Sequence, residues 1–307
     1  MQKRTLTLTL LTLAGCAFTT YEPLVTCDDL LRPKDAAMSL SADGAYLFAA
    51  DFRASPASYA HALRVFDAST GAALASVTLP FSQSPIALAP DHGAGHEDDV
   101  WVLRPDGTRV QYDASLVTTR SIGLPIPTTG ATAAADRYYC DMDRDEAGVT
   151  YITTYERDRG TTWSAYLYRE EGGAWDRVVL GEVSGCARVS SDDLSDTVGV
   201  LDIAGHALSR YDAGDLTALD CQDLTGHAGT PWDLDVEGGF ALLAYRDSSG
   251  GDDDLVLYDD AGAEEDGTFL DRVAAVQLGG DGGEVWAWWT GLDAGSPGRA
   301  AGRFQIE

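Results

Sequence analysis

Three carboxylates alternate along one short segment of the chain, and this spacing could bind a metal ion. The segment reads Asp141-Met142-Asp143-Arg144-Asp145, followed by Gly148. Calcium prefers oxygen ligands, and alternating carboxylates in a turn can supply several of them. An EF-hand type of loop would need Gly directly after the third Asp and Glu at its last position, where Glu146 and Ile152 stand instead. We therefore favour an ordinary turn between two strands and keep calcium as the alternative, with no other cofactor expected.

A second polar segment contains two histidines. It runs from Asp91 to Asp99 and includes His92, His96 and Glu97. Two imidazoles and a carboxylate could hold a transition metal. The spacing is loose and the segment contains no cysteine, so we interpret it as a polar hairpin loop.

The charge balance excludes one class of partner. The chain has 307 residues, with 21 Lys and Arg against 49 Asp and Glu, and its formal net charge is −28. Nucleic acid binding needs a basic face, which this composition does not supply. Because 45% of the residues are hydrophobic, the chain can bury a core and is expected to fold despite its charge.

The N-terminal residues have the pattern of an export signal. Lys3 and Arg4 precede an apolar run over residues 5–13, which is too short for a permanent membrane helix. A buried strand is the alternative, because TLTLTLLTL alternates. The next residues, Leu13-Ala14-Gly15-Cys16, resemble the lipobox of bacterial lipoproteins.

The resemblance implies a specific processing and location. Residues 1–15 would be a signal peptide that is cut before Cys16, residues 16–23 a lipidated linker, and residues 24–307 the folded domain. Acyl chains on Cys16 would anchor the protein to the lipid bilayer of the cell envelope. Position 17 is Ala and not Asp, which in enterobacterial lipoproteins favours the outer membrane.

A repeat extends over the rest of the sequence. An aromatic residue followed by Asp marks the third strand of four units, and Tyr168 and Phe304 fill the corresponding places in the other two, at intervals of 43 to 56 residues. Each unit also contains a Gly- or Asp-rich turn before an apolar strand. The marker positions are Phe66, Tyr112, Tyr168, Tyr211, Tyr258 and Phe304.

This period, with four short alternating strands in each unit, resembles the blade of a β-propeller. The sequence therefore predicts an all-β fold with a single six-bladed β-propeller, with seven blades as the alternative. The sixth unit ends after its third strand, so we expect a strand within Leu24–Leu31 to complete it and remove an exposed sheet edge.

The cysteines are expected to form disulfides in an oxidising compartment. Besides Cys16 they are Cys27, Cys140, Cys186 and Cys221, and these allow three connectivities. Alignment of the repeats places Cys140 and Cys186 in the first strands of consecutive blades, on opposite faces of the blade template. Because neighbouring blades pack front to back, we predict a Cys140–Cys186 disulfide and leave the pairing of the other two open.

Two functions remain after these observations. The first is a membrane-anchored binding or scaffold module without catalysis, whose partner is an envelope protein or a small ligand. Its binding face would lie on the second-to-third-strand loops and the blade connections, with Arg157, His227 and Trp232 as the predicted contacts. The alternative is a calcium-dependent hydrolase or lactonase on the same fold, although lactonase propellers ligate calcium partly through Asn and this sequence has none.

Overall fold

A computed structural model defines the fold of the chain. It describes residues 18–26, 37–55, 58–83, 85–123, 137–157, 163–181, 185–247, 253–259, 264–270, 273–279, 284–289, 292–293, 296–297 and 300–306. Almost all of these residues lie in short antiparallel strands or in the turns between them, as the alternating sequence pattern predicts. Within the described residues, no helix is long and apolar enough to cross a membrane.

Five blades are built from four consecutive strands each, and each pairs in sequence order. Blade 1 contains β2 (Ala37–Leu40), β3 (Tyr46–Ser55), β4 (Ser58–Asp67) and β5 (Ala73–Pro80), followed by the short 3-10 helix η1 (Phe81–Gln83). Blade 2 contains β6 (Ala87–Pro90), β7 (Val100–Leu103), β8 (Thr108–Tyr112) and β9 (Thr118–Gly123). Blade 3 contains β10 (Arg137–Arg144), β11 (Thr150–Arg157), β12 (Trp163–Glu171) and β13 (Ala174–Gly181).

Blade 4 contains β14 (Ala187–Asp192), β15 (Thr197–Asp202), β16 (Ala207–Asp212) and β17 (Ala218–Asp223). Blade 5 contains β18 (Thr230–Glu237), β19 (Phe240–Arg246), β20 (Asp253–Tyr258) and β21 (Glu264–Leu270). A further sheet, here called the closing sheet, contains β22 (Val273–Gly279), β23 (Glu284–Trp289), β26 (Ala300–Ile306) and β1 (Phe18–Thr26). The short strands β24 (Leu292–Asp293) and β25 (Ser296–Pro297) form a separate pair.

The predicted blade count of six, or seven, is corrected by this strand order. Five blades are complete within one continuous stretch of chain, and they make a five-bladed arrangement. The closing sheet, the sixth four-stranded sheet of the ring, is not a blade of that kind because it joins three C-terminal strands to β1 from the N-terminal part. In the sequence, Phe304 stands at the marker position of a sixth unit, which predicted a sixth blade like the others. An N-terminal strand does pair with β26, but it is Phe18–Thr26 instead of a strand within Leu24–Leu31.

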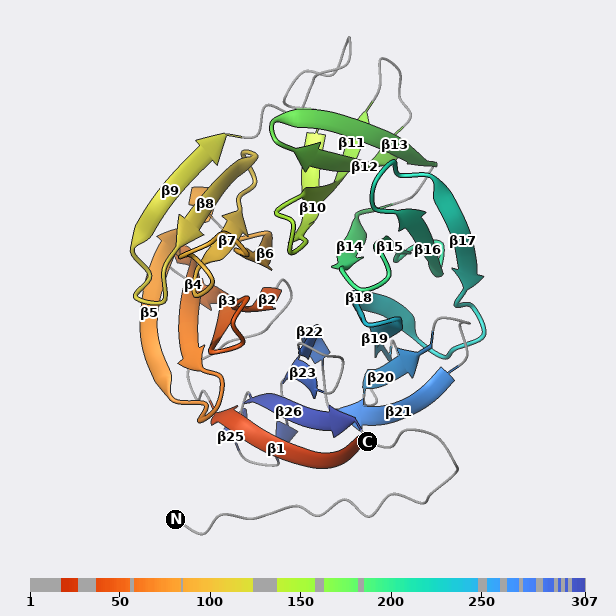
Figure 1. Cartoon of the computed structure of the whole chain (residues 1–307). Coiled ribbons are helices and arrows are strands. Elements are labelled where there is room, and N and C mark those ends of the chain that lie inside the picture. The colour runs from red at the N-terminus through yellow and green to blue at the C-terminus, as the bar shows by residue number, and fades with distance from the viewer. Residues whose placement is uncertain are drawn as a thin grey trace.

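The sheets are arranged in a ring around a central axis (Figure 1). The first strand of each sheet is innermost, and β2, β6, β10, β14, β18 and β22 contact one another in that order around the ring. The outermost strands, such as β9 and β17, are mostly exposed. The middle strands are buried on both sides because neighbouring sheets cover both of their faces, as the fully buried β7 illustrates.

Apolar side chains fill the space between successive blades. Phe48 and Val65 of blade 1 pack with Val100 and Val102 of blade 2 in one cluster. Equivalent clusters lie between blades 2 and 3, blades 3 and 4, and blades 4 and 5. Burial of these side chains at about 25 cal/mol per Å² of apolar area is the main stabilising contribution to the ring.

The two faces of the ring differ in their connections. The turn face carries the tight turns between first and second strands, which include Asp43, Glu146, Asp193 and Glu237. The loop face carries the connections from second to third strands and from one blade to the next. Because strands alternate in direction, every inner strand begins on the loop face and ends on the turn face.

Candidate functional site

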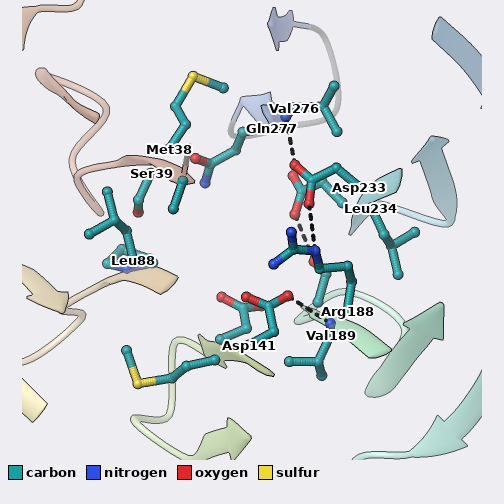
Figure 2. Close-up of a pocket in the computed structure, with 16 residues that line it drawn as sticks. Met38, Ser39, Leu88, Asp141, Arg188, Val189, Asp233, Leu234, Val276 and Gln277 are labelled. Carbon is teal, nitrogen blue, oxygen red and sulfur yellow. Dashed lines mark hydrogen bonds and ion pairs between the residues drawn. The ribbon is translucent and has the colours of Figure 1, made fainter. Parts of the chain in front are cut away.

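Four aspartates from two inner strands line the central channel. Asp141 and Asp143 lie on β10, and Asp233 and Asp235 lie on β18. In each pair the residues are two apart, so both side chains project from the same side of their strand. Figure 2 shows Asp141 and Asp233 on either side of Arg188, which comes from β14 between them.

The first pair of carboxylates connects blade 3 to blade 4. Asp141 Oδ2 accepts a hydrogen bond from the backbone N–H of Val189 at 3.0 Å. Asp143 Oδ2 accepts from the backbone N–H of Ser191 at 2.6 Å and from its hydroxyl at 2.8 Å. The inner strands belong to different sheets, so these N–H groups need acceptors from side chains, and the two aspartates supply them.

The same arrangement repeats further around the ring. Asp233 Oδ2 accepts from the backbone N–H of Val276 at 2.9 Å, and Asp235 Oδ2 accepts from that of Leu278 at 2.5 Å. On the closing sheet, Gln277 Oε1 accepts from the backbone N–H of Leu40 at 2.7 Å. The channel side chains therefore join consecutive inner strands and hold the ring together at its axis.

Burial changes the protonation of these carboxyl groups. Loss of hydration raises the pKa of Asp141 to about 7, the nearby Arg188 opposes this shift, and Asp233 adds to it. Burial also raises the pKa of Asp143 and Asp233, and it raises that of Asp235 well above its usual value. The channel thus contains a carboxyl group that titrates close to neutral pH.

Arg188 is the cation placed among these acids. Its Nε lies 3.7 Å from Asp233 Oδ1 and donates a hydrogen bond to the carbonyl oxygen of Trp232 at 3.4 Å. The space around the channel residues is about 50 Å³. About 10–15 Å³ of such space holds one water molecule, so the channel admits a few waters and is too small for an organic substrate.

A larger cavity opens where the channel meets the turn face. Its volume is about 380 Å³, within the range of small-molecule sites. Carboxylates of Asp43, Glu146, Asp193 and Glu237 line it, together with His92. Burial raises the pKa of Asp193 to about 6, although its carboxylate accepts from the backbone N–H of Glu146. Burial lowers the pKa of His92 despite the surrounding negative charge.

The segment Asp141–Asp145, considered above for calcium, forms the end of β10 and the turn that follows it. Asp141 and Asp143 face blade 4 from β10, as described above. Asp145 lies in the following turn, where Oδ1 accepts from the backbone N–H of Val149 at 2.7 Å and Oδ2 from the hydroxyl of Tyr151 at 3.2 Å. The three side chains therefore have separate partners. Across the described ranges, no group of three or more His, Cys, Asp and Glu residues could hold a metal ion.

The two histidines of the polar segment also have separate surroundings. His92 lines the cavity on the turn face, whereas His96 Nδ1 lies 2.9 Å from Asp99 Oδ2. The segment is a loop between β6 and β7, as interpreted from its sequence.

Two of the three predicted contact residues contact consecutive residues of β19. His227 precedes β18 and Trp232 lies within it, where the Arg246 guanidinium is 3.4 Å from the centre of the Trp232 ring. The His227 ring stacks on Tyr245 with their centres 4.1 Å apart. Arg157 lies apart from them at the end of β11 in blade 3.

An aromatic cluster beside Arg157 escaped the sequence reasoning. Tyr138 and Tyr155 each stack on Trp163, with ring centres 5.3 and 5.0 Å apart. Arg157 lies over the same indole at 5.7 Å. The available signal was the alternation of Tyr155 and Arg157, which places both on one side of β11, but the cross-strand partners depend on the register.

The disulfide prediction is confirmed. Cys140 and Cys186 are bonded, with their Cα atoms 5.2 Å apart, and the bond joins blade 3 to the start of blade 4. Cys221 is exposed and carries a free thiol. Cys27 and Cys16 lie outside the described residues.

Comparison with known proteins supports the fold alone. No protein-family model matches the sequence, and no curated protein matches it. A luciferin-regenerating enzyme is similar in structure, with a TM-score of 0.65 and 12% identity over 94% of this chain and 96% of that one. A calcium-binding protein, regucalcin from Agrobacterium tumefaciens, has a TM-score of 0.59 and 14% identity over 96% and 94%. A chain of a nidogen/laminin complex has a TM-score of 0.52 and 15% identity, over 75% of this chain and 78% of that one.

Proposed function

We propose that this protein is an extracytoplasmic propeller that acts as a binding or scaffold module, and that its loop face contacts a partner protein. The observation that supports this is the concentration of aromatic and arginine side chains on that face. Tyr138, Trp163 and Arg157 lie on blade 3, and Trp232 and Arg246 lie on blade 5. Trp, Tyr and Arg are the residue types that contribute most to protein interfaces.

The cluster on blade 3 is already ordered for binding. Tyr138 is 57% exposed, yet its ring is stacked on Trp163, which in turn is stacked on Tyr155. Immobilising a free side chain on binding costs about 0.5–1.5 kcal/mol. Stacking restricts these rings before a partner arrives, so the cost is reduced. The nearby Cys140–Cys186 disulfide holds β10 in place in the same way.

The channel supports a scaffold role. Its carboxylates accept hydrogen bonds from the next inner strand, as Asp141 does from Val189 and Asp233 from Val276. These contacts make the ring a rigid support for the loops. Rigid elements that carry variable loops are a common arrangement for binding sites.

The proposed lipid anchor would leave the loop face free for a partner. β1 begins at Phe18, which pairs with Ile306 at the end of β26, and β26 ends on the turn face. Lipid attached to Cys16 would therefore hold the turn face toward the bilayer, in the outer membrane on this proposal. The loop face would then point away from the lipid and remain accessible to a partner.

The test is capture of partners from envelope extract by immobilised variants. Trp163→Ala and Trp232→Ala change the loop face, and Leu194→Ala is the matched control because Leu194 is 74% exposed in a turn on the opposite face. A partner retained by the wild type and by Leu194→Ala, and lost by both tryptophan variants, supports the proposal. Equal capture by all variants, or loss with Leu194→Ala alone, contradicts it.

A second candidate is a calcium-dependent hydrolase or lactonase. The observation that favours it is the carboxylate-lined cavity of about 380 Å³ on the turn face, beside the channel carboxyl groups. Two proteins of similar structure, a luciferin-regenerating enzyme and the calcium-binding protein regucalcin, are consistent with this candidate. Calcium-dependent turnover of a panel of lactones that is lost in Asp193→Asn would support this candidate over the first. Absence of turnover with every lactone of the panel would contradict this second candidate.

A further inference from the structure

One arginine connects the central channel to the loop face. Arg188 is near the start of β14, toward the loop-face end of the channel, and Asp141 and Asp233 lie on either side of it (Figure 2). Its guanidinium carbon is 5.7 Å from the centre of the Trp232 ring, which belongs to the proposed binding face. The Arg188 cation is therefore close both to carboxyl groups in the channel and to an indole of that face.

The Nε–H group of Arg188 has two acceptors within reach. It donates to the backbone carbonyl of Trp232 at 3.4 Å, and Asp233 Oδ1 lies 3.7 Å from the same nitrogen. Most N–H···O hydrogen bonds measure about 2.9–3.0 Å between nitrogen and oxygen, so both contacts are longer than the optimum. A small displacement of the guanidinium toward one acceptor strengthens that contact and weakens the other.

The backbone at Trp232 allows such a displacement. The pairing of β18 with β19 shifts register between Pro231 and Asp233, so Trp232 is the extra residue of a β-bulge. The extra residue of a bulge is left out of the ladder of backbone hydrogen bonds. The carbonyl of Trp232 is therefore available to Arg188. Its ring is held by two cations, because Arg246 lies 3.4 Å and Arg188 5.7 Å from the ring centre.

The negative charge that faces Arg188 changes with pH. Burial raises the pKa of Asp141 to about 7 and also raises that of Asp233, while the Arg188 charge opposes both shifts. A carboxyl group attracts the guanidinium when it is ionised and loses this attraction when it is protonated. The channel-lining residues of β2, β6 and β22 carry no charge. The other charged or titratable groups that act on the channel carboxyls are Asp143, Asp235 and Arg246 and, at the turn face, His92 and Glu237.

We propose that Arg188 couples the protonation of the channel carboxyl groups to the position of Trp232, so that the loop face binds its partner more tightly at acid than at alkaline pH. The inference rests on the binding function proposed for this face. When Asp141 and Asp233 are ionised, they draw the guanidinium into the channel and weaken its contact with Trp232. When they are protonated, the carbonyl and the ring of Trp232 attract the guanidinium instead. The ring is then fixed between two cations, and a partner meets a side chain that is already ordered.

Fluorine NMR of the purified protein, with 5-fluorotryptophan in place of tryptophan, tests the coupling without a partner. The chain has seven tryptophans, and the Trp232 signal is the one that disappears in Trp232→Phe. As the pH is raised through the Asp141 pKa of about 7, we expect this signal to shift along a titration curve with its midpoint near that value. Arg188→Gln should remove the shift, and so should Asp141→Asn combined with Asp233→Asn.

Arg169→Gln is the matched control for the arginine variant. The Nε–H of Arg169 also donates to a backbone carbonyl of the next blade, that of Ala213 at 2.7 Å, and Arg169 is on the third strand of its blade instead of the inner strand. This variant should therefore keep the titration of the Trp232 signal. Arg188→Lys retains the positive charge and should keep a part of the shift.

The outcomes separate the coupling from the binding function. A Trp232 signal that does not move with pH, or that titrates equally in Arg188→Gln, overturns the coupling, and so does loss of the titration in Arg169→Gln. The capture experiment described above, repeated at acid and alkaline pH, should show retention that falls as the pH rises in the wild type and stays constant in Arg188→Gln. A titrating signal with no captured partner would refute the proposed binding function alone, whereas capture with a signal that does not titrate would refute the coupling alone.

Discussion

Replacing Asp141 with Asn should stabilise the protein at pH 8. Burial raises the pKa of this carboxyl group from 3.8 to about 7, so at pH 8 the folded state holds an ionised group in an unfavourable environment. A shift of roughly three units at about 1.36 kcal/mol per unit corresponds to a penalty on the order of 4 kcal/mol. The amide oxygen of Asn can still accept the hydrogen bond from the Val189 N–H.

The sign of the pH dependence follows from the direction of the shift. Because the pKa is higher in the folded state, the contribution of Asp141 is fully present below pH 3.8 and is lost as the pH rises through about 7. The wild type should therefore lose stability across this interval, and Asp141→Asn should lose less. The two proteins should be nearly equal in stability at about pH 4.

Urea denaturation at a series of pH values between 4 and 8 measures this difference in the free energy of unfolding. Asp67→Asn is the control with the opposite sign, since hydrogen bonds from Ser69 and Thr70 lower the pKa of Asp67. Its ionised form is stabilising, and this contribution is lost as the pH falls, so the Asn variant should be the less stable protein at pH 8. A lower stability of Asp141→Asn at pH 8, or an unchanged pH profile, would refute the reasoning, and the first result would show that the attraction of the Arg188 charge outweighs the effect of burial.

Three further predictions concern the ends of the chain and the disulfide. Reduction, or Cys140→Ala with Cys186→Ala, should lower the free energy of unfolding by about 2–4 kcal/mol because the bond closes a long loop; equal urea midpoints would contradict this. Deletion of residues 18–26 removes β1 and exposes the edge of β26, so the protein should aggregate or lose cooperative unfolding. Unchanged melting would show that β1 is dispensable. Cys16→Ser should abolish labelling by a palmitate analogue, and equal labelling would exclude the lipobox.

The repeated strand pattern and the disulfide were accessible from the sequence. Alternation along a strand and the turn that follows it are local properties, so each blade can be recognised from its own residues. Cys140 and Cys186 could be paired because the repeats place them in neighbouring inner strands, and the structure joins Cys140 of β10 to Cys186 directly before β14. The count of complete blades was less accessible, because a strand from residues 18–26 pairs with one that begins at Ala300.

The roles of individual polar residues depended on the tertiary structure. Asp141 finds its partner, Val189, 48 residues away in the next blade, and no pattern near Asp141 indicates this contact. In the same way, Trp101 meets Arg144 only because blades 2 and 3 pack face to face. Periodicity in a sequence tells which side of a strand a residue occupies, since the strand geometry is local. Which residue of the next blade lies opposite is decided by the packing and closure of the whole ring.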